Sequence, residues 1–266
     1  MKILFSTGSL SHLPIEDVFT LAGKAGFDGC DLVIDKKFND PQFKESVIRC
    51  LDILPVHSLH APYERIEAWG TEVQALFRAM ELAREVNAQV VTFHPPSWLA
   101  REISYYRWFR KVKDFQEELR CGSVSLSIEN MPLIKLILPP YFYNHFKKLI
   151  RFGRERNLYF TFDITHLGTY GCDIVSAFLI YSDTKRLKNV HVSDYSLWRE
   201  KSHLGLGRGE LPIVRLLNTM RKLGYDQFIT LEISPHEMPR TTEWLLQVMS
   251  YASSFLKLHS GRSVDL

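Results

Sequence analysis

The sequence predicts a single (β/α)8 TIM barrel, and three observations support this fold class. Eight short β-rich runs recur every 25 to 40 residues, with a helix-like segment between each pair. The chain has 266 residues, and one barrel typically uses about 250. No internal repeat, low-complexity stretch or linker rich in Pro, Gly or Ser marks a second domain. We therefore expect eight parallel strands that close on themselves, with helices between them.

The predicted strands are rich in β-branched and aromatic residues. They span residues 2–7, 30–34, 56–61, 90–94, 124–129, 159–163, 189–194 and 228–233. The intervening segments carry apolar residues at helical spacing instead. Examples are Val73, Leu76, Phe77, Met80, Leu82 and Ala83 in one segment, and Ile213, Leu216, Leu217 and Met220 in another. This change of period predicts helices that pack one apolar face on the strands.

Proline and glycine mark the expected helix ends. Pro14 and Pro41 each sit at an expected first helical turn, and Gly26 and Gly224 lie just past expected helix ends. The last residues of the chain are polar. We assign residues 1–258 to the barrel domain and residues 259–266 to a loose C-terminal tail.

Composition narrows the class of protein. Hydrophobic residues make up 45% and charged residues 24%, which is ordinary for a globular protein with a sizeable core. The net charge of +3 is too small to indicate nucleic-acid binding by itself. Four cysteines without paired spacing indicate reduced thiols. The first apolar run is too short for a signal peptide, and no run approaches the ~20 residues of a membrane span. We expect a cytoplasmic protein without a membrane partner.

Ionisable residues gather at the carboxyl ends of the predicted strands, where barrels of this kind build their active sites. They are His60, His94, Glu129, Asp163, His191 and Glu232. A single histidine in an apolar strand is more often a hydrogen-bonded core residue than a ligand. Three carboxylates and three imidazoles on one ring, however, would repel or stay unsatisfied without a cation. The pattern predicts a divalent-metal site that suits Mn, Zn, Co or Fe, with Mg where carboxylates dominate.

Short motifs follow one another in a specific order along the chain. They read LHAP, FHPP, SIEN, FDITH, HVSD, SHLGLGRGEL and LEIS, and they extend from about residue 56 to residue 234. Each is weak alone, but the ordered set resembles the xylose-isomerase-like TIM-barrel superfamily. That superfamily includes sugar and sugar-phosphate isomerases and epimerases, and also endonuclease IV, an abasic-site nuclease. The resemblance implies a metal-dependent enzyme on a TIM barrel.

The resemblance also implies roles for individual residues. Glu129, Asp163, His191 and Glu232 match the shared four-ligand metal set, and in the epimerases the two glutamates also face the substrate. His166, three residues after Asp163, matches the histidine of an FD-x-x-H motif. That histidine contacts substrate in isomerases and binds a further zinc ion in endonuclease IV.

Other matches leave the branch of the superfamily open. His60 and His94 match additional zinc ligands of the nuclease, but isomerases often keep histidines there as pocket residues. His203 also resembles a nuclease zinc ligand, yet that branch expects an aspartate two positions earlier, where this chain has Lys201. A second departure follows Glu129, where the nuclease continues with small residues and this chain reads NMPLIK.

Further substrate contacts are expected at the barrel mouth, in addition to His60, His94 and His203. Residues 205–211, GLGRGEL, are similar to a glycine-rich loop of both branches, and its Arg208 is a candidate contact to a phosphate or a sugar hydroxyl. Trp98 is a candidate stacking surface for a sugar ring. An exposed arginine is more often simply solvated, and helix packing competes with stacking for the aromatic residues of this region.

The leading hypothesis is a divalent-metal-dependent isomerase or epimerase that acts on a sugar, sugar phosphate or related polyol by removing a proton next to a carbonyl. Glu129 and Glu232 would share the proton transfer, and His166 would orient hydroxyl groups. The alternative is an endonuclease IV-like phosphodiesterase at abasic DNA sites, in which nucleic acid is the partner and several ions act together. A binding barrel without activity is disfavoured because the ligand set is complete. The substrate, the physiological metal, the number of ions and the oligomeric state stay open.

Overall fold

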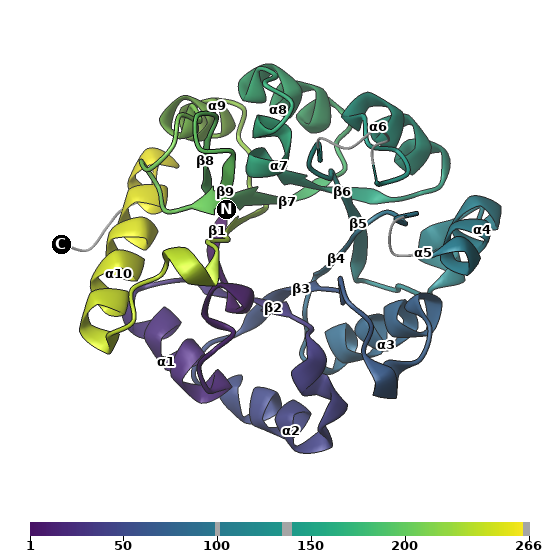
Figure 1. Ribbon diagram of the computed structural model, residues 1–266, viewed down its shortest axis with the longest axis horizontal. Helices are drawn as coiled ribbons and strands as arrows, with labels where there is room; N and C mark the ends of the chain where they lie inside the picture. The colour runs from purple at the N-terminus through teal and green to yellow at the C-terminus, as the bar shows by residue number, and fades with distance from the viewer. Residues whose placement is uncertain (99–101, 135–139, 263–266) are drawn as a thin grey trace.

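The predicted strands form a closed parallel barrel with helices around its outside (Figure 1). The computed structural model describes residues 1–98, 102–134 and 140–262. The order around the barrel is β1-β10-β7-β6-β5-β4-β3-β2, which confirms the predicted fold class. The barrel strands are β1 (Lys2–Ser6), β2 (Gly29–Val33), β3 (Val56–His60), β4 (Val90–Phe93), β5 (Ser125–Glu129), β6 (Tyr159–Asp163), β7 (Leu187–Val192) and β10 (Phe228–Leu231).

Helices connect successive barrel strands and cover the barrel from outside (Figure 1). They are α1 (Ile15–Lys24), α2 (Pro41–Cys50), α3 (Glu72–Glu85), α4 (Ile103–Lys111), α5 (Phe115–Glu118), α6 (Phe146–Glu155), α7 (Ile164–Gly168), α8 (Ile174–Asp183), α9 (Ile213–Lys222) and α10 (Thr242–His259). Short 3-10 helices follow four strands, namely η1 (Thr7–Leu10), η2 (Lys36–Asn39), η3 (Glu67–Trp69) and η4 (Pro235–Glu237).

The helix ends follow the local signals of the sequence. Pro41 is the first residue of α2, and the Asp40 carboxylate before it accepts a hydrogen bond from the backbone of Gln42. Gly26 and Gly224 have φ angles of +80° and +66° just past α1 and α9, in the left-handed region that favours glycine. The predicted helix boundaries at these positions are confirmed.

Alternation along the strands sorts side chains between the barrel interior and the helices. Phe160 and Phe162 of β6 are fully buried in the core between barrel and helices. Thr161 points the other way, because its hydroxyl meets that of Thr92 from the non-adjacent strand β4 at 2.8 Å. Small polar residues therefore face the interior, and on six of the barrel strands an ionisable residue stands two positions further along the chain. The pairs are Ser58 and His60, Thr92 and His94, Ser127 and Glu129, Thr161 and Asp163, Asn189 and His191, and Thr230 and Glu232.

Most strand boundaries differ from the sequence prediction by one or two residues. The expected strand 189–194 ends earlier, at Val192, and a separate antiparallel pair follows, formed by β8 (Asp194–Ser196) and β9 (Lys201–Leu204). His259, predicted as the start of the tail, is the last residue of α10. Residues 263–266 of the predicted tail lie outside the described residues. Among the helices of the described ranges, none combines the length and hydrophobicity that crossing a membrane requires.

Candidate metal centre

Four side chains from four strands meet at the carboxyl end of the barrel. Glu129 ends β5, Asp163 ends β6, His191 lies in β7 and Glu232 follows β10 by one residue. One donor atom of each lies within 4.8 Å of the donor atoms of the other three. The His191 Nδ1 atom is 2.8 Å from Glu232 Oε2, 3.2 Å from Glu129 Oε1 and 4.0 Å from Asp163 Oδ2. The structure thus brings together the four residues that the resemblance pointed to.

The donor atoms of these four residues are unsatisfied. Glu129 Oε1, Asp163 Oδ2, His191 Nδ1 and Glu232 Oε2 are buried and form no hydrogen bond with any described residue. The His191 contacts to Glu129 and Glu232 have ion-pair distances but not the angles of hydrogen bonds. Buried polar atoms are nearly always hydrogen-bonded. Carboxylate and imidazole donors are ligands of Mn, Zn and Co, so one divalent cation here would satisfy all four atoms.

Opposite charges stabilise each other within this group. Burial raises the pKa of Glu129, but the charge of His191 and the hydrogen bonds from His60 and His94 outweigh it and hold that pKa well below its ordinary value. Burial lowers the pKa of His191, but the charges of Glu129 and Glu232 outweigh it and raise that pKa well above its ordinary value. Burial likewise raises the pKa of Glu232, but the His191 charge outweighs it and lowers that pKa. Both glutamates are therefore held in the ionised form.

Asp163 differs from the two glutamates because one of its oxygens is already used. Its Oδ1 accepts a hydrogen bond of 2.6 Å from the backbone nitrogen of His166 and caps the N-terminus of α7. This bond leaves Oδ2 directed to the donor group. Burial raises the pKa of Asp163, and although His166 and His203 lower it, the charges of Glu129 and Glu232 add to the rise. A cation at the centre would favour the ionised form.

A second group of donors shares Glu129 with the first and consists of His60, His94 and Glu129. The Nε2 atoms of His60 and His94 lie 3.2 Å and 3.0 Å from Glu129 Oε2. The His60 Nδ1 atom faces the carbonyl of Ala61 at 2.8 Å. Burial lowers the pKa of His60, but the hydrogen bond and charge of Glu129 outweigh it and raise that pKa to about 9. Burial lowers the pKa of His94. The two oxygens of Glu129 therefore face two different donor groups.

A third group consists of Asp163, His166 and His203. The rings of His166 and His203 lie 5.2 Å apart, edge to face. Lys201, at the position where the nuclease pattern expects an aspartate, turns away and pairs with Glu237 at 3.4 Å. The third group therefore holds three donors, and the lysine adds none.

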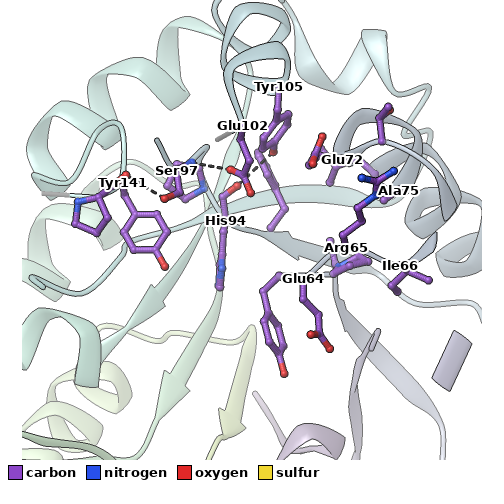
Figure 2. Close-up of a pocket in the computed structure, with 18 of the residues that line it drawn as sticks. Glu64, Arg65, Ile66, Glu72, Ala75, His94, Ser97, Glu102, Tyr105 and Tyr141 are labelled. Atoms are coloured by element: carbon purple, nitrogen blue, oxygen red, sulfur yellow. Dashed lines mark hydrogen bonds between the residues drawn. The ribbon is translucent and has the colours of Figure 1, made fainter. Parts of the chain in front are cut away.

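A cavity of about 760 Å³ lies beside the second donor group. His94 is part of its lining (Figure 2), so the cavity and the donor groups share a wall. The other walls include the rings of Tyr63, Tyr105 and Tyr141 and the carboxylate of Glu102. This size lies within the usual range of small-molecule sites.

Two predicted substrate contacts lie outside both the lining of this cavity and the donor groups. Trp98 is 39% exposed, and its backbone nitrogen donates to the carbonyl of Pro140 at 3.0 Å. The Arg208 side chain is 58% exposed and pairs with Glu237 at 3.0 Å. Both residues are accessible to a ligand at the mouth, but neither joins the donor groups.

The sequence did not single out Asp194, which organises the glycine-rich loop. Its carboxylate accepts hydrogen bonds of 2.9 to 3.1 Å from the backbone nitrogens of Tyr195, Gly207, Gly209 and Leu211. A Cβ atom on Gly209 would collide with the Tyr195 carbonyl, so the close approach requires glycine there. The available signal was the aspartate that ends HVSD shortly before a glycine-rich run.

A second residue that the sequence did not single out is Asp31 in β2. Asp31 has no solvent exposure, and its Oδ2 atom lies 3.9 Å from His191 Nε2. Burial raises the pKa of Asp31. The available signal was a single acidic residue in the otherwise apolar strand CDLVI.

Comparison with known proteins places the sequence in a family. The family model described as xylose isomerase-like TIM barrel matches residues 19–251. An uncharacterized protein of Mycobacterium leprae (strain TN) is 26% identical over 305 residues, which cover 96% of this chain and 98% of that protein. An uncharacterized protein of Methanocaldococcus jannaschii is 24% identical over 250 residues, which cover 87% of this chain and 84% of that protein.

Solved structures with the same fold include several sugar epimerases. A D-tagatose 3-epimerase-like protein has a TM-score of 0.73 at 18% identity and covers 97% of both chains. D-psicose 3-epimerase with D-tagatose, from Clostridium cellulolyticum H10, has a TM-score of 0.71 at 12% identity, covering 98% of this chain and 99% of its own. The IolI protein with a bound zinc atom has a TM-score of 0.71 at 15% identity, and the match covers 96% of this chain and 98% of the IolI chain. These likenesses establish the fold, and the match over residues 19–251 shows that the chain belongs to the xylose isomerase-like TIM-barrel family.

Proposed function

We propose that this protein is a divalent-metal-dependent isomerase or epimerase of a sugar, sugar phosphate or related polyol. The observation that carries this proposal is the set of four unsatisfied, buried donor atoms that meet at one point, next to a second donor group whose His94 lines a cavity. Mn, Zn, Co and Mg are the candidate ions, and the second and third donor groups leave room for more than one. Similar folds in sugar epimerases support the reaction class by analogy.

The roles of the two glutamates follow from their surroundings. A divalent cation supplies a Lewis acid that polarises a substrate carbonyl and its neighbouring hydroxyl. The Glu232 side chain is 26% exposed, so its carboxylate can reach a substrate carbon at the mouth. Glu129 is held through Oε2 by His60 and His94. Both carboxylates are ionised, which is the form a general base needs.

The division of the proton transfer between the glutamates decides the product. Glu129 and Glu232 come from different strands, so one would take a proton from carbon while the other, after taking up a proton from solvent, would donate it to the opposite face. This exchange inverts one carbon and gives epimerisation. Return of the proton to the neighbouring carbon by a single glutamate gives isomerisation.

We assign substrate binding to the histidines and the mouth residues. His166 and His203 can orient hydroxyl groups, and His94 can contact the part of the substrate that enters the cavity. Trp98 and Arg208 would contact the substrate from the rim, where both are accessible. We place the protein in the cytoplasm, because its four cysteines are free thiols. We assign the activity to the barrel domain, residues 1–258.

One observation favours an endonuclease IV-like phosphodiesterase at abasic DNA as a second candidate. The structure gathers His60 and His94 with Glu129, and His166 and His203 with Asp163, so three ions have donors. Lys201 opposes this candidate because it replaces an acidic ligand and pairs elsewhere. The sugar isomerase or epimerase therefore stays the preferred function.

Metal analysis together with two parallel assays separates the candidates. The purified protein would be analysed for bound metal, and samples loaded with Mn, Zn, Co or Mg would be incubated with ketoses, ketose phosphates and an abasic duplex. One ion per chain with an isomerised or epimerised sugar supports the proposal, whereas three zinc ions with a nicked duplex support the alternative.

Two variants complete this experiment. Glu129→Gln should be inactive, because it removes a ligand and a base. Ser127→Ala, two residues earlier in the same strand, removes a buried hydroxyl without a hydrogen-bond partner and should behave like the wild type. If no carbohydrate is converted by the metal-loaded wild type, the proposal is wrong.

A further inference from the structure

The imidazole of His191 faces two different surroundings with its two nitrogens. Its Nδ1 atom points to the three carboxylates of the metal centre. Its Nε2 atom points to the barrel interior, 3.2 Å from Asn189 Nδ2 and 3.9 Å from Asp31 Oδ2. His191 has no solvent exposure, so bulk solvent does not reach either nitrogen.

A metal ligand at Nδ1 imposes one tautomer on this ring. A nitrogen that binds a metal carries no proton, so the proton of the neutral imidazole lies on Nε2 and needs an acceptor. The amide nitrogen of Asn189 only donates, and its oxygen is engaged by the Thr230 hydroxyl at 3.0 Å. Asn189 as placed therefore does not supply the acceptor.

In other histidines of the centre, the Nδ1 atom has a backbone carbonyl as an acceptor. The Nδ1 atom of His60 lies 2.8 Å from the Ala61 carbonyl, and that of His166 lies 2.9 Å from the Asn130 carbonyl. The Nδ1 atom of His203 lies 3.3 Å from the Glu232 carbonyl. For His191, no backbone carbonyl of the described residues forms a corresponding hydrogen bond with Nε2.

Among the described residues, Asp31 lacks a well-placed hydrogen-bond donor, whereas His191 Nε2 lacks an acceptor. Asp31 is fully buried, and neither carboxylate oxygen has a well-formed hydrogen bond with any described residue. Burying a carboxylate without partners is costly. A movement of about 1 Å would bring Oδ2 to hydrogen-bond distance from His191 Nε2. A carboxylate that accepts from a metal-bound histidine is a common way to fix the tautomer and orientation of such a ligand.

We propose that Asp31 is a positioning residue that accepts a hydrogen bond from the Nε2–H of His191 and thereby presents the Nδ1 lone pair to the divalent cation. This inference rests on the proposed metal-dependent function. Asp31 itself is outside the three donor groups, so it acts through His191. Removing it should weaken metal binding without removing a ligand.

The test measures metal affinity directly, with full-length protein and without substrate. Wild type, Asp31→Asn and Asp31→Ala would be stripped with chelator and titrated with Zn or Mn by calorimetry. An acceptor next to a ligand histidine typically contributes about 10- to 100-fold in affinity. We expect a loss of about 100-fold for Asp31→Ala and about 10-fold for Asp31→Asn, whose amide oxygen can still accept a hydrogen bond.

Two further readouts separate positioning from a merely structural role. Long-range proton–nitrogen NMR of the zinc-loaded wild type should show His191 protonated at Nε2, and this signal should change in Asp31→Asn. Thermal unfolding in chelator should be unchanged or raised for Asp31→Asn, because a buried carboxylate without partners is removed. Ser127→Ala, another buried and unpaired polar residue of the interior, should keep wild-type affinity.

The outcomes distinguish this inference from the proposed function. Wild-type affinity in both Asp31 variants would overturn the positioning role and leave the proposed function standing. A loss of affinity that comes with an equal loss of stability in chelator would also overturn the positioning role alone. A wild type that binds no divalent cation would overturn both. A wild type that binds the cation and loses affinity on Asp31 substitution, but converts no carbohydrate, would overturn the proposed function alone.

Discussion

Asp163→Asn should raise the stability of the protein in the absence of metal. It should also reduce the stabilisation that added metal provides. The substitution keeps an oxygen that can accept from the His166 backbone nitrogen, and asparagine caps helices about as well as aspartate. It replaces Oδ2, the unsatisfied atom that faces Glu129 and Glu232, by an uncharged amide. The variant therefore removes a proposed metal ligand and a source of repulsion while it preserves α7.

The spacing of the donor atoms sets the scale of the gain in stability. At 4.8 Å, the largest separation within the donor group, and an effective dielectric constant of about 20, two negative unit charges repel by about 3.5 kcal/mol. The unfolding entropy of 266 residues, at about 2.1 cal/mol/K each, is about 0.56 kcal/mol/K. Removing one such repulsion corresponds to a rise in Tm of about 6 °C. Nearby histidines and the raised pKa of Asp163, which follows first from burial, reduce it.

Thermal unfolding of wild type and Asp163→Asn, each in chelator and in excess Mn or Zn, tests both halves of the prediction. Metal at about 1,000 times its Kd stabilises the wild type by about 4.1 kcal/mol, or about 7 °C on the same scale. Asp163→Asn should melt higher than the wild type in chelator and gain little from metal. A lower Tm in chelator, or an undiminished gain with metal, would refute the reasoning.

Three further substitutions test other parts of the structure. Glu232→Gln should abolish turnover and weaken metal binding while the circular dichroism spectrum stays unchanged, and full activity in this variant would contradict the assignment. Asp194→Ala leaves four backbone N–H groups without their acceptor and should lower the free energy of unfolding in urea by about 2–5 kcal/mol. An unchanged midpoint of urea unfolding would exclude a structural role for Asp194. Burial raises the pKa of Asp28, but hydrogen bonds from Arg262 and the Ile3 backbone, together with nearby positive charge, outweigh it and lower that pKa below 3.8. Because the folded pKa is depressed, Asp28 stabilises the fold above about pH 4 and loses this effect as the pH falls through the folded value. The Tm deficit of Asp28→Asn at pH 7 should therefore shrink below pH 4, and a constant deficit would contradict this account.

The barrel and its ionisable ring could be predicted from the sequence because both depend on local patterns. Each strand is a short run in which apolar and small polar residues alternate, and this period sends every second side chain inward. His60, Glu129 and Asp163 stand at the last position of such runs, and Glu232 stands one residue beyond. In a parallel barrel the last positions of all strands meet at one end. The presence of a shared site therefore followed from strand positions alone.

Only the tertiary structure decided which atoms face one another. The two oxygens of Glu129 face different groups because β3 and β4 bring His60 and His94 to one side while β7 brings His191 to the other. Asp31 lies only 3.9 Å from His191, although 160 residues separate them, because both strands end near the same level of the barrel. Side-chain rotamers and the stagger of neighbouring strands set such distances, and neither is encoded in a local pattern.

The rim of the barrel depended on tertiary structure in the same way. The sequence gives no sign of an ion-pair partner for Lys201 or Arg208. The β8–β9 pair and the loop after it bring both side chains to Glu237. Asp194 draws four backbone nitrogens of the chain after it onto one carboxylate. The chain thus determined that ionisable side chains would gather at one end of a barrel. The packing of distant segments determined which of them share a partner, because a contact between residues far apart in sequence exists only after the barrel has closed.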